Sequence, residues 1–287
     1  MNSSERYVQP LSLVTRLRTV YRVLTRVIAV DWSGASRNEG KHLWLAEADS
    51  TGCLVRLEAP RNRAALAGDL LLGRENVAIG LDFAFSFPAW FVERLGVRNA
   101  PELWGRVTEC GETWLAVCDP PFWGRPGRGR PVLAGSAWRR AELAAPRVGG
   151  IGPKSVFQIG GAGTVGTGSI RGMPVLHALH TSGARIWPFV AGGGKPLVVE
   201  IYPRLLTGKV RKSDPAERHK LLAECYPRLQ PEHVRLAVAS EDAFDATVSA
   251  LVMIEHIDDL RALPEEHDPE LCLEGRIWHP GWRLDKP

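Results

Sequence analysis

Three apolar segments that read as buried strands each end at a carboxylate, and this repeated placement constrains the fold more than any other feature. The segments are VIAVDW at 27–32, VAIGLDFAF at 77–85 and KPLVVEIYP at 195–203, and their acids are Asp31, Asp82 and Glu200. A buried carboxylate without a partner costs roughly several kcal/mol. Ligands of open α/β sheets bind beyond the carboxyl ends of the strands, so the pattern predicts one shared site.

Carboxylates that meet at such a site repel one another and cannot all stay ionised unless a cation lies among them. Mg²⁺ suits the site because it prefers oxygen ligands and leaves positions for water and a substrate phosphate. Alternatively, each acid caps a loop or pairs with a surface arginine. Because the placement recurs on three strands, we favour a metal site with Asp31, Asp82 and Glu200 as ligands.

The pattern of the remaining segments predicts an α/β domain over 27–260. Short loops containing Gly and Asn join the first three strands, which indicates an antiparallel meander. A right-handed crossover through a helix would place the strand at 77–85 parallel to the first strand. The expected further elements are strands at 41–48, 53–59 and 184–190, and helices at 61–72, 173–183 and 240–257.

Three segments are expected to lie outside this core. Residues 1–26 carry five arginines against Glu5 and form a basic N-terminal extension or, alternatively, an organelle-targeting segment. Residues 89–170 form an insertion rich in Gly, Trp and Arg with only short helical patterns. Residues 261–287 are expected to be a C-terminal tail.

Composition excludes several classes of protein. No apolar run approaches the ~18 residues that cross a bilayer, so no membrane association is expected. The net charge of +4 is too small to indicate a nucleic-acid partner by itself. The five cysteines are odd in number and form no C-x-x-C pair, which fits a protein of the reducing cytoplasm without a zinc site.

Two further acids, Asp242 and Asp245, lie three residues apart at the start of the last predicted helix and therefore share a face. Acids in a first helical turn are also favoured by the helix dipole, and Ser240 is a natural N-cap. The pair is thus either part of the site or a helix-start signal. Ser33, in the turn after Asp31, is either a substrate contact or a plain turn serine.

The insertion contains a strongly basic stretch between 121 and 150, where six arginines and one glutamate give a local charge of +5. Arginines bind phosphates and tryptophans stack on bases, so this stretch resembles a nucleic-acid groove. The alternative is a solvated loop whose tryptophans fill a small core. The candidate substrate-binding residues here are Arg125, Arg128, Arg130 and Trp123.

A glycine-rich segment at 155–172 contains a formal G-x-G-x-x-G but lacks the acid about 20 residues later that a dinucleotide site needs. We expect a loop near the site whose backbone N–H groups contact phosphate, with help from Lys154 and Gln158, or else a purely structural loop.

Four phrases, VDWSGA, IGLDFAFSFP, VEIYPR and SEDAFDATVSAL, resemble the domain of unknown function 429 family, predicted nucleases of the ribonuclease H-like superfamily. The resemblance covers about residues 27–255. It implies a mixed five-stranded sheet of order 3-2-1-4-5 flanked by helices. It also implies a two-metal phosphodiesterase, with Asp31 and Asp82 as metal ligands and Asp245 as the closing carboxylate. Asp242 is similar to the extra helix acid of Holliday-junction resolvases.

The expected function is therefore hydrolysis of DNA or RNA with Mg²⁺ or Mn²⁺, catalysed through Asp31, Asp82, Asp242, Asp245 and Glu200. Two alternatives remain open. One is an actin-like phosphotransferase, in which DWSGAS would be the phosphate loop and two domains would be usual. The other is a nucleic-acid-binding scaffold without catalysis.

Overall fold

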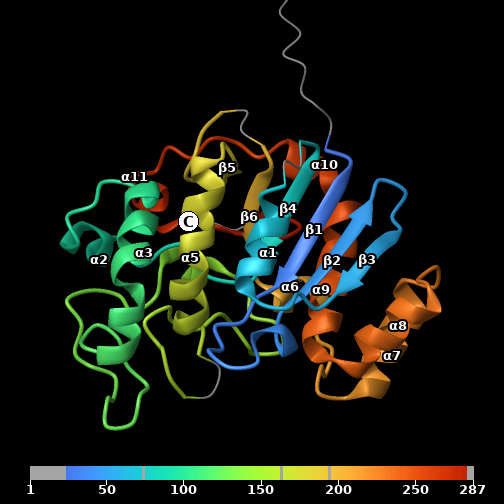
Figure 1. Cartoon of the computed structure of the whole chain (residues 1–287), viewed down its shortest axis with the longest axis horizontal. Helices are drawn as coiled ribbons and strands as arrows, with labels where there is room; N and C mark the ends of the chain where they lie inside the picture. Colours follow the sequence, from blue (N-terminus) through green and yellow to red (C-terminus); the bar gives the residue numbers. More distant parts are fainter. Residues whose placement is uncertain (1–23, 73–74, 162–163, 193–194, 283–287) are drawn as a thin grey trace, which may run out of the picture.

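The computed structural model describes residues 24–72, 75–161, 164–192 and 195–282. These residues form an α/β structure in which helices cover both faces of one mixed, seven-stranded sheet (Figure 1). Within the same ranges, no helix combines the length and apolar character that crossing a bilayer requires. Most of the predicted basic extension at 1–26, and the last five residues of the predicted tail, lie outside the described residues.

The first half of the sheet confirms the predicted meander. Strands β1 (Arg26–Asp31), β2 (Trp44–Asp49) and β3 (Leu54–Glu58) pair antiparallel in sequence order. Helix α1 (Arg63–Leu70) then crosses over to β4 (Val77–Leu81), which pairs parallel with β1 as predicted. The two central strands therefore end at the same edge of the sheet.

The second half differs in detail from the predicted five-stranded order. Strand β6 (Leu197–Ile201) pairs parallel with β4, and two short strands share its other side. Strand β5 (Arg185–Ile186) pairs with its first half and β7 (Ile277–Trp278) with its second half, giving β3-β2-β1-β4-β6-β5 with β7 on β6. The prediction of a tail from 261 was therefore wrong for these residues, because β7 belongs to the sheet and Trp278 is fully buried.

Side-chain alternation along the strands divides the core into two layers. Ile28 and Val30 of β1 pack with α1, α3 (Ala100–Val117) and α5 (Gly166–Thr181) on one face. Val27 and Ala29 pack on the opposite face with α9 (Glu241–Glu255). The alternation thus decides which helices a side chain at a strand end will meet.

The insertion is more helical than its sequence pattern indicated. Helix α3 spans 18 residues and packs against α5 (Figure 1). Asn99 caps it, and Leu103, Val107 and Leu115 recur on its buried face. Helix α5 begins at Gly166, so the end of the predicted glycine-rich loop is helical.

The other helices are short segments that surround these layers. They are the 3-10 helix η1 (Glu39–Lys41), α2 (Ala89–Arg94), α4 (Arg140–Ala144), α6 (Pro203–Thr207), α7 (Pro215–Cys225), α8 (Pro231–Ala239), α10 (Ile257–Arg261) and α11 (Pro269–Glu274).

Candidate active site

Two of the predicted acids lie at adjacent strand ends. Asp31 is the last residue of β1, and Asp82 directly follows β4. The neighbouring Val30 and Leu81 are register partners, and the Asp82 backbone N–H donates to the Val30 carbonyl at 3.1 Å. Asp31 shares its face of β1 with Val27 and Ala29, the face that α9 covers.

Helix α9 brings further acids to the same place. The Ser240 hydroxyl accepts the Ala243 N–H at 3.2 Å and so fixes the start of the helix, which packs across β1 and β2. Asp245, in the second turn, is only 9 % exposed. Asp242, one turn earlier, is more open, with one oxygen 3.5 Å from Nδ1 of His42. The N-cap prediction for Ser240 is thereby confirmed.

The pKa values of these acids show that their charges interact. Burial raises the pKa of Asp31 well above its ordinary value, and the charges of Asp82, Asp245 and Asp242 raise it further. Burial, followed by the charge of Asp245, raises the pKa of Asp82 to about 8. Burial also raises the pKa of Asp245, against the opposing effect of Lys212. We call Asp31, Asp82 and Asp245 the acid cluster; it is a set of carboxylates that repel one another in a poorly solvated place.

Lys212 is a member of this site that the sequence did not indicate. Its ammonium lies 2.5 Å from Oδ2 of Asp245, and both side chains are nearly covered. It stands in the loop between α6 and α7, 33 residues before its partner, with no periodicity to link the two. The sequence motif KSDP signals the N-terminus of α7 and carries no information about this contact.

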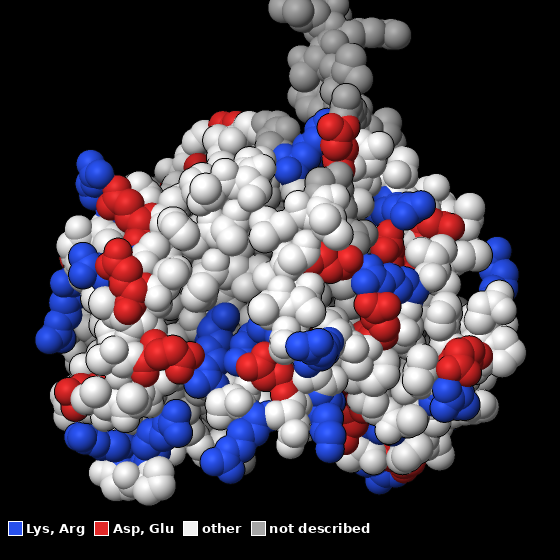
Figure 2. Space-filling view, in the orientation of Figure 1, with Lys and Arg blue, Asp and Glu red and all other residues white. Residues whose placement is uncertain are grey.

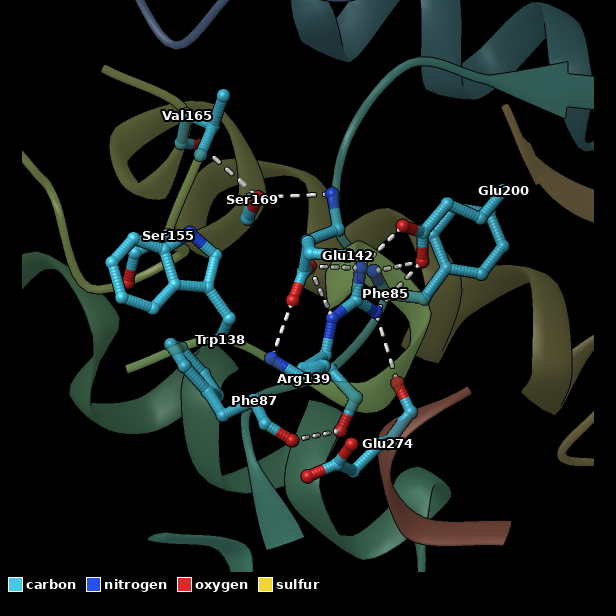
Figure 3. Close-up of polar contacts among 12 residues, drawn as sticks. Phe85, Phe87, Trp138, Arg139, Glu142, Ser155, Val165, Ser169, Glu200 and Glu274 are labelled. Atoms are coloured by element: carbon cyan, nitrogen blue, oxygen red, sulfur yellow. Dashed lines mark hydrogen bonds and ion pairs between the residues drawn. The ribbon is translucent and has the colours of Figure 1, made fainter. Parts of the chain in front are cut away.

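Glu200 has a different environment from the acid cluster. Glu200 lies two residues after Val198 on β6, so both side chains point to the same face of the sheet. Val198 packs in the layer of α3 and α5, which is the face opposite Asp31. The carboxylate oxygens of Glu200 accept hydrogen bonds from both terminal nitrogens of Arg139, at 2.9 and 2.5 Å, and from the Phe85 backbone N–H at 2.9 Å (Figure 3). The predicted metal-ligand role of Glu200 does not fit, because its negative charge is already paired.

Arg139 is the centre of a buried network that joins the insertion to the sheet. Its side chain is fully buried and also contacts Glu142 and the Glu274 carbonyl (Figure 3). The Glu274 carboxylate accepts backbone N–H groups of Ala89 and Arg140. Burial raises the pKa of Glu142 to about 7 even though Arg139 opposes the shift. This network, which the sequence analysis missed, holds the start of α4 beside the ends of β4 and β6.

A cavity of about 610 Å³ opens beside the acid cluster and contains several of the predicted substrate-binding residues. Ser33, Asp82, Arg125 and Lys154 line it, together with Arg171 from α5. Lys and Arg side chains also gather along the lower edge of the face in Figure 2, towards which β1 points in Figure 1. The cavity therefore combines carboxylates at one wall with cationic groups around it.

The other predicted substrate contacts do not line this cavity. Trp123 is buried, and the Arg130 guanidinium lies over its ring and over that of Trp138, at 5.5 and 4.7 Å. Arg128 lies 3.7 Å from Asp119, and the Gln158 amide donates to a neighbouring carbonyl. The alternative of a small core of tryptophans thus describes Trp123 better than a base-stacking surface does.

The loop after β1 is held against the first turn of α5. Trp32 donates to the Gly168 carbonyl at 3.0 Å, and Arg171 donates to the Gly34 carbonyl at 2.5 Å. A Cβ on Gly34 would lie 2.4 Å from the Gly168 backbone nitrogen, a contact that no side-chain rotation relieves. This loop and this helix form one wall of the cavity.

Gly34→Ala should therefore destabilise the protein by about 1–3 kcal/mol, the usual range for overpacking. Urea denaturation measures the change. Gly68→Ala is the matched control, because Gly68 lies in α1 and a Cβ there meets nothing within 4 Å; its effect should be neutral or slightly stabilising. Equal stability of Gly34→Ala and the wild type would contradict the close packing of loop and helix.

The acid cluster has the chemistry of a divalent-metal site but is not arranged as a complete one. Its donors are carboxylate oxygens, and Oδ1 of Asp245 is buried without a hydrogen-bond partner among the described atoms. Yet within the described ranges no three His, Cys, Asp or Glu side chains are grouped so that they could hold one ion. Lys212 occupies one side of the cluster, so an ion would need some carboxylates to reorient.

Comparisons of this chain with protein-family models, with curated proteins and with solved structures give no match.

Proposed function

We propose that this protein is a ribonuclease H-like hydrolase that cleaves phosphodiester bonds of DNA or RNA with Mg²⁺ or Mn²⁺. The observation that carries the proposal is the acid cluster. Two neighbouring strand ends and one helix bring Asp31, Asp82 and Asp245 together at the edge of a cavity, with pKa values that reflect mutual repulsion and burial. Burying carboxylates that repel one another lowers the stability of the fold. Their presence therefore favours a function that requires these acids.

The topology and the cavity support the same proposal. Counting β6 as the fifth strand, the order β3-β2-β1-β4-β6 agrees with the order that the family resemblance implies. The described residues form a single sheet, whereas the actin-like alternative usually has two domains. Arg125, Lys154 and Arg171 supply positive charge on the cavity wall, where a phosphate group would be attracted.

In this proposal the chain's own groups position charge and contribute little covalent chemistry. Asp31, Asp82 and Asp245 would hold the divalent ion once their carboxylates had reoriented, and Arg125 and Lys154 would orient the phosphodiester. The ion, when bound, supplies charge neutralisation at the phosphate and an activated water. Asp242, which is partly exposed and lies one turn before Asp245 on α9, would orient water or substrate. Ser33 accepts the Ala35 N–H at 3.1 Å, which stabilises the turn at the cavity mouth.

Incubation with labelled DNA, RNA and branched substrates tests the proposal. We expect cleavage of one of these classes with Mg²⁺ or Mn²⁺, none with EDTA, and loss of cleavage in Asp31→Asn. Asp258→Asn is the matched control, because Asp258 is a carboxylate on α10 whose side chain is 88 % exposed. Nucleic-acid binding that needs no divalent ion and survives Asp31→Asn would instead indicate the non-catalytic scaffold.

A further inference from the structure

A second cavity, of about 420 Å³, adjoins the cavity beside the acid cluster, because Arg125 and Arg171 line both. Its other lining residues include Val117, at the C-terminal end of α3, and Arg128. In Figure 1 this end of α3 points towards the lower edge of the molecule, along which Lys and Arg side chains gather in Figure 2. The second cavity thus continues the first one along a basic edge.

A tight turn presents two arginines to the second cavity. The Arg128 N–H donates to the Arg125 carbonyl at 2.9 Å, and Pro126 and Gly127 occupy the two central positions of the turn. Gly127 has a φ of +73°, a left-handed conformation that glycine adopts readily, and the proline ring fixes its own φ. Both arginines are therefore held at one turn before any ligand binds.

Backbone hydrogen bonds fix the base of this turn. The Gly124 N–H donates to the Arg128 carbonyl at 2.8 Å. The Trp123 N–H donates to the Phe157 carbonyl at 3.1 Å, and the Ile159 N–H donates to the Trp123 carbonyl at 2.9 Å. The turn is thereby attached to the glycine-rich segment that leads into α5, the helix that forms a wall of the first cavity.

The charges around the second cavity leave Arg125 available for an anion. Arg171 pairs with Glu112 through two nitrogens, at 2.7 and 2.9 Å. Arg128 lies 3.7 Å from Asp119, and 50 % of its side chain is exposed. The Arg125 guanidinium makes no hydrogen bond or ion pair with another described residue, although it lies between the two cavities. A phosphate that passes from one cavity to the other would meet this guanidinium.

The walls and the volume of the second cavity match one nucleotide. Ala116 and Val117 are both exposed and supply apolar surface for a base, while Arg125 and Arg128 supply donors for phosphate oxygens. A volume of about 420 Å³ lies within the range of roughly 300–1,000 Å³ that is usual for pockets of single small molecules. A nucleotide fits such a space, whereas a base-paired duplex is too wide to enter it.

We propose that the substrate is a single nucleic-acid strand that occupies both cavities. The scissile phosphodiester lies beside the acid cluster, the adjoining phosphate binds Arg125, and the next nucleotide enters the second cavity, where Arg128 binds its phosphate. This assignment rests on the proposed function and names its substrate class. A strand must extend beyond the first cavity to bind with full affinity.

Fluorescence polarisation in Mg²⁺ tests the proposal on labelled single strands of two and eight nucleotides, with Asp31→Asn as the parent that does not cleave. The longer strand should bind the parent more tightly. Adding Arg128→Gln should weaken its binding about tenfold and reduce the slope of log affinity against log salt by about 0.7, because one phosphate contact is lost. Binding of the shorter strand should not change. Arg98→Gln is the matched control, because Arg98 is an exposed arginine that also pairs with a carboxylate, at the opposite end of α3; it should change neither strand.

The possible outcomes separate the second cavity from the proposed function. Equal affinity for the two strands, equal affinity for a duplex of eight base pairs, no effect of Arg128→Gln, or no binding at all would overturn the role of the second cavity. If the wild type then cleaves both strands with equal kcat/KM, the metal-dependent hydrolase stands without it. Length-dependent binding that Arg128→Gln weakens, without cleavage in any divalent ion, would support the second cavity and overturn the hydrolase.

Discussion

In the absence of metal, Asp82→Asn should raise the free energy of unfolding at pH 9 by about 2 to 5 kcal/mol. The reason is that the wild-type fold must ionise a carboxyl whose pKa is raised to about 8, chiefly by burial and then by Asp245. The difference between the ordinary value of 3.8 and about 8 corresponds to at most about 6 kcal/mol. Asparagine is close in shape and carries no charge, so it removes this cost.

The sign of the pH dependence follows from the proton count. Between pH 4 and 8 the native state retains the Asp82 proton while the unfolded chain has lost it. The native state thus binds more protons, and wild-type stability falls as pH rises through this window. Below pH 4 both states are protonated, so the advantage of Asp82→Asn should disappear there. Thermal unfolding in EDTA at pH 4, 7 and 9 measures this dependence.

A bound metal ion should reverse the order of stability of the wild type and Asp82→Asn. A bound divalent ion stabilises the ionised cluster, so saturating Mn²⁺ should stabilise the wild type, by about 2.7 kcal/mol at a concentration of 100 Kd. Asp82→Asn should lose most of this gain, and Asp258→Asn should keep it. A variant that matches the wild type in pH dependence and in Mn²⁺ response would show that Asp82 does not belong to an ion-binding cluster.

The second large effect is expected at the buried network around Arg139. Arg139→Met should destabilise the protein by about 3–5 kcal/mol, because it leaves Glu200 and Glu142 buried without their cation. Urea denaturation gives the free energy. Hydrogen exchange should become faster across the insertion, since the network joins α4 to the sheet.

Two further variants isolate the electrostatic cause. Arg140→Met removes the neighbouring arginine, whose partners Asp268 and Glu270 are partly exposed, and should cost less than about 1 kcal/mol. Arg139→Met combined with Glu200→Gln should recover part of the loss, because one uncompensated charge is removed with the cation. No recovery in the double variant would indicate that packing around Arg139, and not charge, supports this region.

The sequence indicated the central part of the fold because its signals are local. Alternating apolar residues and Gly- or Asn-containing turns defined β1, β2 and β3, and Ser240 marked a helix start that the structure confirms. The strand expected at 184–190 is only two residues long, as β5, and β7 was not predicted because a two-residue strand has no periodicity. Their pairing with β6 depends on contacts between residues far apart in the chain.

By itself, the sequence determined that acids end two neighbouring parallel strands and begin a helix, because strand patterns and an N-cap can be read from adjacent residues. Only the tertiary structure decided which acids share a site. One step of alternation along β6 sends Glu200 to Arg139 on the face opposite Asp31. A loop without any pattern brings Lys212 to Asp245. Both outcomes depend on packing between distant segments, and no local arrangement of residues specifies them.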